Sequence, residues 1–274
     1  ADDMVSTVLS ICEQPKLFVP AMNFRMWQSI ATQNATSNLR SNGSIVMNPN
    51  EGYLASMHKG EGRLPELHDI INEIRSIFEL PTPLKNKKIL VTAGPTREHL
   101  DPIRFISNKS SGKMGYALAE SSRDFGGDVT LISGPVSINP PPEIKIVNIE
   151  TADEMYCEMI KNLNVDVIIM CAAISDYKPI DISVDKIKRN KENLSLDMKP
   201  TSDIIQKIAK KTDALIIAFA LETSDGEKNA KKKLTKKNAD YIILNHPNKD
   251  NCGIESNYNK VTVFDRVNNK KIFN

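Results

Sequence analysis

The 274-residue sequence contains few cysteines, few aromatic residues and no long apolar run. The four cysteines, Cys12, Cys157, Cys171 and Cys252, are scattered without a Cys-x-x-Cys pair, which argues against a disulfide framework and favours reduced thiols in the cytoplasm. No apolar stretch reaches the length of a membrane span, so we expect no membrane contact. Aromatic residues are 5% of the chain and the net charge is +2, which argues against a nucleic-acid partner.

Apolar residues make up 40% of the chain and charged residues 26%, as in an ordinary globular protein of one large or two medium domains. Pro81-Thr82-Pro83 separates two parts, because each proline restricts its own φ and the residue before it. We therefore expect a first domain at 1–80, a linker at 81–86 and a second domain at 87–274. The chain starts without an initiator Met in a segment patterned like a helix interior, so we expect a fragment whose N-terminal part is missing.

The first part has helix patterns at 3–13, 23–42 and 66–78, strand patterns at 16–19 and 44–47, and an irregular loop after the second strand. The second part alternates strands and helices. Its strands are predicted at 88–92, 129–133, 144–149, 166–171, 214–220 and 241–245, its helices at 113–125, 152–163, 203–211 and 226–238, and a closing hairpin at 261–265 and 270–273. Short runs of Ile, Val and Leu in this order predict a doubly wound α/β sheet, whose ligands lie beyond the carboxyl ends of the strands.

The stretch from Lys88 to Ala119 carries the clearest functional pattern. Its apolar strand ends at Gly94-Pro95-Thr96-Arg97, and a loop of Gly, Ser and Lys at 107–113 runs into an amphipathic helix. Such a loop presents backbone N–H groups and the positive end of a helix to an anion, most often a phosphate. The polar residues that converge on this loop system and predict a nucleotide-using protein are Arg97, Arg104, Asn108, Lys109 and Lys113.

Two common nucleotide motifs are absent from this stretch. Gly94 is followed by Pro-Thr-Arg and the next glycine is Gly112, so there is no Gly-x-Gly-x-x-Gly, and the second strand ends without the acidic residue that would bind a ribose. Ser111-Gly112-Lys113 lacks the upstream glycine of a Walker A loop, and Met114 follows the lysine. A Rossmann-type NAD(P) oxidoreductase remains the alternative enzyme.

Further polar motifs follow the later strands. Asp176 either binds a ribose, a base or a metal-bound phosphate, or caps the next segment. The loop at 184–189 contains Lys186 and two further cations, which fits a triphosphate contact or a solvated basic run. Ser202 or Thr201 is the expected cap of the helix that follows.

Two more positions come from the last strand–helix pair. Phe219 ends a strand, so it either lies against a base or packs in the core. Lys233 and Lys237 are four residues apart and share a helix face, which is directed at phosphates or at solvent.

The second part resembles the phosphopantothenate–cysteine ligase domain of the bifunctional coenzyme A biosynthesis family. It shares, in order over roughly 87–245, the motifs TAGPTRE, DPIRFISNKSSGKMG, AAISDYKP, DKIKR, SDII, FALET and NADYIILN. The first part resembles the C-terminal portion of the partner domain, a flavin-dependent phosphopantothenoylcysteine decarboxylase, through PAMNFRMW at 20–27 and GEGR at 60–63. The resemblance implies a Rossmann-like α/β ligase domain preceded by the C-terminal part of a flavodoxin-like decarboxylase domain.

The resemblance also implies a two-step ligation. The carboxylate of 4′-phosphopantothenate attacks the α-phosphate of CTP to give an acyl-cytidylate and pyrophosphate, and the amine of L-cysteine then displaces CMP. Mg²⁺ is implied with the triphosphate, whereas no metal site built by the protein and no nucleophilic side chain are required. CTP rather than ATP follows from the likeness to bacterial members, since no residue here reads a base edge unambiguously.

Functional positions carry over where the motifs match. Asn108 matches the asparagine that handles the acyl-cytidylate, and Arg104 lies near it. Lys186 matches a lysine of a flexible loop that helps to close a site at a dimer interface. The matching nucleotide-binding positions are Ala172, Asp176, Lys186, Ser202, Asp203, Ile204, Ile205, Phe219, Lys233 and Lys237.

The decarboxylase part matches less completely. Asn23 matches the asparagine that holds the substrate carboxylate, and FMN is the implied cofactor, although much of the family's flavin-phosphate site would precede Ala1. Ser56 stands where the family carries a reactive cysteine, and a hydroxyl is a far poorer acid than a thiol. His58 is expected to be a surface residue. A homo-oligomer is implied, and a catalytically impaired regulatory subunit that binds nucleotide is the non-enzymatic alternative.

Overall fold

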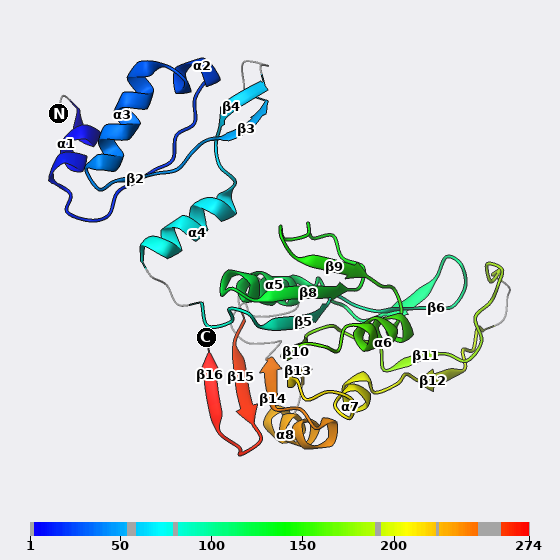
Figure 1. Ribbon diagram of the computed structural model, residues 1–274. Coiled ribbons are helices and arrows are strands. Elements are labelled where there is room, and N and C mark those ends of the chain that lie inside the picture. Colours follow the sequence, from blue (N-terminus) through cyan, green and yellow to red (C-terminus); the bar gives the residue numbers. More distant parts are fainter. Residues whose placement is uncertain are drawn as a thin grey trace. The chain divides into compact units, whose positions relative to one another are not determined.

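The computed structural model describes residues 3–53, 59–78, 82–189, 193–222, 225–245 and 259–273. The chain forms two compact units, Ala1–Pro81 and Thr82–Asn274 (Figure 1). Among the described residues, no helix has the length and apolar character that crossing a membrane requires. Ser56 and His58 of the sequence predictions lie outside these ranges.

The first unit is a small α/β arrangement. Its elements are α1 (Met4–Ile11), β1 (Leu17–Phe18), α2 (Phe24–Trp27), α3 (Ile30–Ser41), β2 (Ile45–Val46), β3 (Asn50–Tyr53), β4 (Lys59–Arg63) and α4 (Leu67–Ile77). The strands β1 and β2 pair in parallel with α2 and α3 between them along the chain, as in a βαβ unit.

Two predictions for this unit were wrong. The single helix predicted over 23–42 is two helices, because Ser29 caps α3 by accepting a hydrogen bond from the N–H of Thr32. The segment predicted as an irregular loop contains the antiparallel pair β3–β4.

The second unit is built on one large sheet. Its elements are β5 (Lys88–Ala93), β6 (Arg97–His99), β7 (Phe105–Ser107), α5 (Lys113–Asp124), β8 (Asp128–Ser133), β9 (Lys145–Asn148), α6 (Ala152–Lys161), β10 (Val167–Met170), β11 (Tyr177–Pro179), β12 (Met198–Pro200), α7 (Ile204–Ile208), β13 (Leu215–Leu221), α8 (Gly226–Lys237), β14 (Tyr241–Asn245), β15 (Val261–Asp265) and β16 (Lys270–Phe273).

The strand order of this sheet is β16-β15-β14-β13-β10-β5-β8-β9. The strands from β9 to β14 run parallel, and β15 and β16 pair antiparallel at one edge. In chain order the parallel strands follow the 3-2-1-4-5-6 arrangement of a Rossmann sheet, so the predicted doubly wound fold and closing hairpin are confirmed. The order reverses between β5 and β10, and ligands bind outside the strand ends at such a point.

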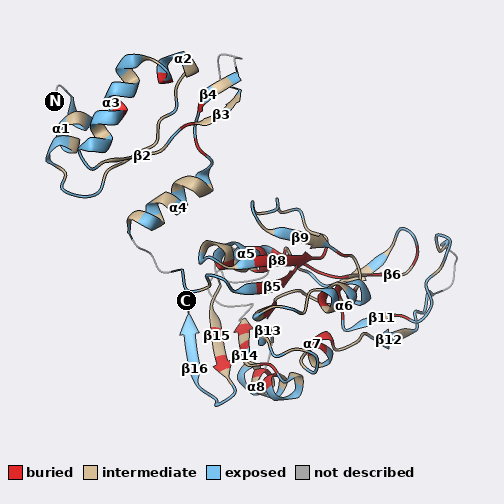
Figure 2. Ribbon diagram, viewed as in Figure 1, coloured by how far each residue is buried: buried red, intermediate tan, exposed pale blue. Residues whose placement is uncertain are grey.

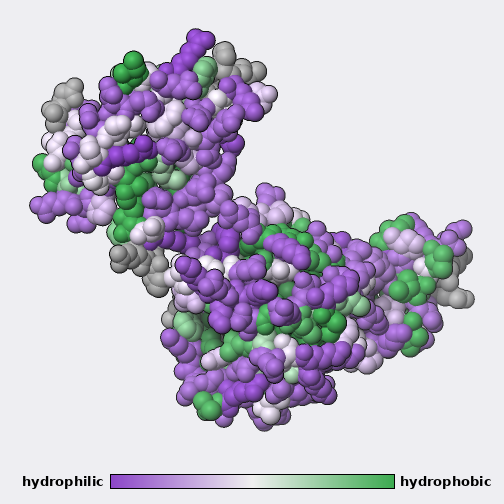
Figure 3. Space-filling model, viewed as in Figure 1, coloured by the Kyte–Doolittle hydropathy of each residue, from purple (hydrophilic) through white to green (hydrophobic). Residues whose placement is uncertain are grey.

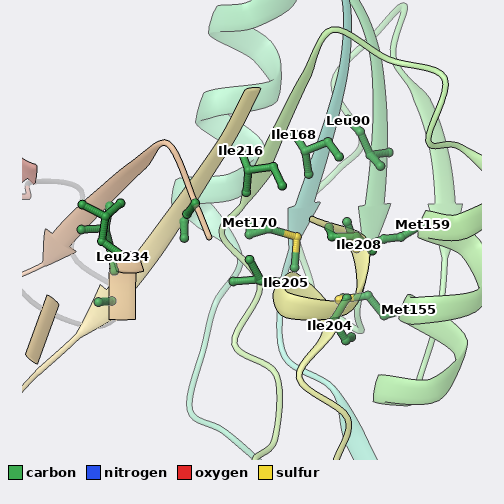
Figure 4. Close-up of a cluster of buried hydrophobic side chains, with 14 of the residues drawn as sticks. Leu90, Met155, Met159, Ile168, Met170, Ile204, Ile205, Ile208, Ile216 and Leu234 are labelled. Carbon is green, nitrogen blue, oxygen red and sulfur yellow. The ribbon is translucent and has the colours of Figure 1, made fainter. Parts of the chain in front are cut away.

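Helices cover both faces of the sheet, and the central strands are the most buried part of the unit (Figure 2). Helix α5 packs on one face, where Tyr116 and Ala119 meet Ile89, Val91 and Leu131. Helices α6, α7 and α8 pack on the other face. Figure 4 shows this second core, in which Met155, Met159, Ile204, Ile205, Ile208 and Leu234 of the helices meet Leu90, Ile168, Met170 and Ile216 of the strands.

Two antiparallel ribbons, β6–β7 and β11–β12, leave the sheet next to its strand ends and contact each other through β6 and β11 (Figure 1). We call them, with the loop at 180–189, the arm. Both ribbons fall in segments that the sequence predicts only as loops.

Candidate functional site

A cavity of about 860 Å³ opens at the carboxyl ends of β10, β13 and β14, beside the start of α5 and near the point where the strand order reverses. Polar loops and strand ends form its wall. It is lined by Asn108, Lys109, Ser110, Ser111, Gly112, Lys113, Met114, Gly115, Met170, Cys171, Ala172, Ala173, Ile174, Asp176, Tyr177, Pro200, Thr201, Ser202, Asp203, Ile204, Ile205, Phe219, Ala220, Leu221, Lys233, Lys237, Asn245 and Asn259. The structure therefore brings Asn108 and nine of the ten predicted nucleotide-binding positions into one cavity, and it leaves out Lys186.

Three glycines bring the phosphate loop close to β5. Gly94 and Gly112 have φ values of +73° and +78°, which side chains rarely adopt. A Cβ on Gly112 would lie 2.7 Å from Cγ1 of Val136, and a Cβ on Gly115 would lie 2.5 Å from Cβ of Ala93. Gly112 and Gly115 have the spacing of the last two glycines of a dinucleotide motif, and the β6–β7 ribbon lies between Gly94 and Gly112. The ribbon separates Gly94 from this pair, so no contiguous Gly-x-Gly-x-x-Gly is found.

The N-terminus of α5 faces this cavity. The helix begins at Lys113, and its cap Gly112 supplies no side-chain hydrogen bond to the first turn. The first turn of a helix carries unpaired N–H groups and partial positive charge, both of which suit an anion. This arrangement fits the phosphate site that the sequence predicts at 107–113.

Asn108 joins the phosphate loop to the end of β10. Its side-chain Nδ2 donates to the carbonyl oxygen of Ile174 at 2.9 Å and lies 3.4 Å from that of Ala173. The Ala173 N–H donates in turn to the carbonyl of Gly94 at 2.9 Å, and the Ser175 N–H donates to Oγ1 of Thr96 at 3.0 Å. The two loops that follow β5 and β10 are thus held together at the centre of the site.

The two predicted phosphate lysines are each paired with a carboxylate. Lys233 Nζ lies 2.5 Å from Oε1 of Glu222, and Lys237 Nζ lies 3.8 Å from Oδ1 of Asp203. Asp203 also caps α7 by accepting from the N–H of Gln206 at 3.2 Å, so the cap is not Ser202 or Thr201 as predicted. Both lysines line the cavity with their charges held in place by these partners.

The described residues that line the cavity supply neither an activated thiol nor a metal cage. Cys171 lines it, but burial raises the pKa of the Cys171 thiol to about 12, so it stays protonated at neutral pH. Within the described ranges, no group of three or more His, Cys, Asp and Glu side chains is placed to hold a metal ion. Phe219 packs partly buried against the α5-side core and also lines the cavity.

Arg104 and Lys186 lie on the arm and do not line the cavity. Arg104 Nη2 lies 2.9 Å from Oδ2 of Asp101, and the same guanidinium donates to the carbonyl of Ile187. The fully buried Asp101 carboxylate also accepts the backbone N–H groups of Ile103 and Arg104 at 2.8 Å each and of Ile187 at 3.1 Å. Asp101 and Arg104 thus fasten the Lys186 loop to the turn of the β6–β7 ribbon.

These contacts set the charge state of Asp101. Burial would raise the pKa of its carboxyl, but the three backbone N–H donors and the Arg104 guanidinium together hold that pKa at about 2. The sequence prediction contained Arg104 and Lys186 but missed Asp101. Asp101 holds the Lys186 loop through a contact with Ile187, which is 86 residues away along the chain.

Asn23 belongs to the first unit. It caps the short helix α2, and its side chain accepts from the N–H of Arg25 at 2.9 Å. The side chain is therefore held at the start of α2 in the motif that the sequence marks as decarboxylase-like.

The fold and the cavity define the class: a Rossmann-type α/β domain with a cavity near the point where the strand order of its sheet reverses, preceded by a smaller α/β unit. Family models agree with this division, since residues 84–274 match the DNA/pantothenate metabolism flavoprotein C-terminal domain and residues 1–79 match the flavoprotein domain.

Relatives and solved structures define the family more narrowly. The coenzyme A biosynthesis bifunctional protein CoaBC of Bacillus subtilis is 38% identical over 99% of this chain and 68% of its own length. That of Escherichia coli K12 is 37% identical over 96% of this chain and 66% of its length. A protein of an unidentified prokaryote named cysteine/cysteine sulfinic acid decarboxylase is 36% identical over 98% of this chain and 77% of its length.

The crystal structure of a CoaBC C-terminal domain is 38% identical, covers 70% of this chain and 87% of its own, and has a TM-score of 0.59. The DNA/pantothenate metabolism flavoprotein of Streptococcus pneumoniae is 25% identical, covers 68% of this chain and 92% of its own, and also has a TM-score of 0.59. The chain belongs to the family of coenzyme A biosynthesis bifunctional proteins. Neither an NAD(P) oxidoreductase nor a regulatory subunit is supported by these matches.

Proposed function

We propose that this protein joins 4′-phosphopantothenate to L-cysteine at the expense of CTP, as the ligation step of coenzyme A biosynthesis. Coenzyme A biosynthesis and ligation follow from the family; the choice of CTP, the metal and the roles of single residues are our proposal. The observation that carries it is the cavity itself, which gathers Asn108, the α5 N-terminus and two lysines where a Rossmann sheet binds its ligand.

In the first step, a carboxylate oxygen of phosphopantothenate bonds to the α-phosphorus of CTP as the bond to the pyrophosphate oxygen breaks. The N–H groups of the first turn of α5, with Lys233 and Lys237, neutralise phosphate charge. We assign the acyl phosphate to the Asn108 amide, a role supported by its position between the loops after β5 and β10. We assign the base to Phe219 and the ribose to Ala172 and Asp176, all of which line the cavity.

In the second step, the amine nitrogen of cysteine bonds to the acyl carbon, the carbon–oxygen bond to CMP breaks, and the amine loses a proton. No side chain has to act as nucleophile, which suits a cavity whose thiol, Cys171, is held protonated. Mg²⁺ bound to the triphosphate would supply further charge neutralisation, and it would arrive with the nucleotide, since the described residues form no metal cage of their own.

The first unit carries the decarboxylase part of the proposal. The family uses FMN, and we assign the carboxylate of the substrate to Asn23, whose side chain is fixed at the start of α2. The product of this step in intact family members is 4′-phosphopantetheine.

We further propose that the ligase unit acts as a homodimer in the cytoplasm. Cys12, Cys157 and Cys171 are free thiols. The arm exposes many apolar side chains (Figure 3). Its exposed apolar residues include Ile103, Phe105, Tyr177, Ile180, Ile182 and Val184. A second copy that covered this surface would place Arg104 and Lys186 at the interface between the two copies. A monomer mass in sedimentation equilibrium would contradict the proposed homodimer.

Pyrophosphate release tests the proposal. We expect release only with phosphopantothenate and a nucleotide present, sustained turnover only when cysteine is added, and the highest rate with CTP when CTP, ATP, GTP and UTP are compared. Asn108→Ala should abolish most of this rate. Oxidation of NAD(P)H by the same preparation, without pyrophosphate release, would support the rejected oxidoreductase instead.

A further inference from the structure

The charged side chains that the structure describes around the cavity do not balance a free triphosphate. Among these residues, four lysines line the cavity, Lys109, Lys113, Lys233 and Lys237, together with two carboxylates, Asp176 and Asp203. Each of the last two lysines is already engaged by a carboxylate. A nucleoside triphosphate carries about four negative charges at neutral pH, because its terminal phosphate is nearly doubly ionised. The described side chains of the lining therefore offer fewer net positive charges than a free triphosphate carries negative ones, and the partial charge at the start of α5 makes up only part of the difference.

Glu222 adds to this imbalance, because it pairs with the lining residue Lys233 although it does not line the cavity itself. It follows β13 directly, and its side chain is 14% exposed. One carboxylate oxygen pairs with Lys233 at 2.5 Å, and the other accepts from Nδ2 of Asn229 at 3.2 Å. Lys233 and Asn229 are four residues apart on α8, so the Glu222 carboxylate contacts two successive turns of the helix. A half-exposed lysine ammonium is in this way held at the cavity wall.

The same contact has a cost for an incoming anion. A phosphate that contacts the Lys233 ammonium comes to within about 6 Å of the Glu222 carboxylate on its other side. At about 6 Å, like charges repel measurably even in water. A divalent cation on the phosphates removes about two of the negative charges that meet this repulsion.

We propose that Glu222 is the residue that makes the cavity select the metal-bound form of the nucleotide. Its carboxylate positions Lys233 for the phosphates and repels a triphosphate that carries no divalent cation. This inference rests on the proposed function and deepens it, because it concerns the same nucleotide site. Glu222 touches no reacting atom and acts through Lys233 and through its charge.

Binding of CTP, measured by isothermal titration calorimetry once with EDTA and once with excess Mg²⁺, tests the inference without turnover. Wild type should bind the Mg²⁺ form at least about tenfold more tightly than free CTP. In Glu222→Gln this ratio should shrink by about tenfold, because one charge fewer repels the two extra charges of the free nucleotide at about 6 Å. Most of the change should be tighter binding of free CTP.

Three variants control for structure. Glu222→Asp keeps the charge and should keep the metal dependence even if affinity falls. Asn229→Asp adds a carboxylate beside Glu222 and should increase the dependence, which keeps the inference testable if Glu222→Gln does not fold. Glu227→Gln removes a glutamate of the same helix that pairs with Lys270 and does not line the cavity, so it should leave the ratio unchanged.

The outcomes are separable. A ratio that is the same in wild type, Glu222→Gln and Asn229→Asp would overturn the inference and leave the proposed function standing. Failure of wild type to bind CTP in either condition would overturn the proposed function and this inference with it.

Discussion

Replacing Gly115 by alanine tests whether the packing of α5 on β5 shapes the phosphate end of the cavity. The added Cβ would lie 2.5 Å from Cβ of Ala93, 3.0 Å from Cα of Ala93 and 3.1 Å from the carbonyl oxygen of Thr92. Non-bonded carbon atoms pack at about 3.5–4.0 Å, so the start of α5 has to move away from β5 by about 1 Å. The helix end that would meet the phosphates moves with it.

The cost in stability is modest. Overpacking a core costs about 1–3 kcal/mol, and alanine is favoured over glycine in a helix by about 1 kcal/mol, which leaves a net loss of about 0–2 kcal/mol in the free energy of unfolding. The cost in rate is larger, because a misplacement of about 1 Å at a reacting centre can lower a rate on the order of 100-fold. We therefore expect ligation to fall by about 10–100-fold while the protein stays folded.

Pyrophosphate release and denaturant unfolding of the same preparation measure both effects. Ala93→Gly removes the closest atom, so the double variant Ala93→Gly with Gly115→Ala should regain part of the lost rate. An unchanged rate in Gly115→Ala, or a loss that Ala93→Gly does not relieve at all, would refute the reasoning.

Three further predictions concern other parts of the second unit. Lys186→Gln should lower the ligation rate at least about tenfold. It should change the free energy of unfolding by less than about 0.5 kcal/mol, because Lys186 is an exposed loop residue. A rate within about twofold of wild type would show that Lys186 has no role in ligation. Thr151→Ala removes the capping box of α6, in which Thr151 accepts a hydrogen bond from the Glu154 N–H at 3.2 Å. It should lower the free energy of unfolding, measured by urea denaturation, by about 1 kcal/mol, whereas Thr151→Ser should leave it nearly unchanged. Because the pKa of Asp101 is lowered to about 2, its contribution to stability is fully present above its unfolded pKa of about 3.9 and is lost as pH falls through about 2. In Asp101→Asn, the free energy of unfolding should therefore depend less steeply on pH in the acid range. An unchanged dependence would contradict this.

The strands of the large sheet could be predicted from the sequence, whereas the strands of the arm could not. The central parallel strands Lys88–Ala93 and Val167–Met170 are buried and rich in Ile, Val and Leu, so each is recognisable from its own residues. Strands β6, β7, β11 and β12 have three residues each, and all but β7 contain charged residues or proline, so their pairing comes from tertiary contacts that no local pattern encodes.

The site shows the same limit. Motif matching identified the lining residues Asn108, Phe219 and Lys233, because each sits at a strand end or on a helix face that the fold directs to the cavity. It missed Asp101 and Glu222, which act by holding other residues in place. Their partners are known only once the chain is folded, and a carboxylate in a loop has no pattern of its own.

The most direct test of the central claim follows one oxygen atom. Phosphopantothenate labelled with ¹⁸O in its carboxylate is turned over with CTP and cysteine, and the products are analysed by mass spectrometry. An acyl-cytidylate at this cavity predicts that one labelled oxygen appears in CMP and none in pyrophosphate. Label in an inorganic phosphate product, or product formed with no label in CMP, would contradict the account.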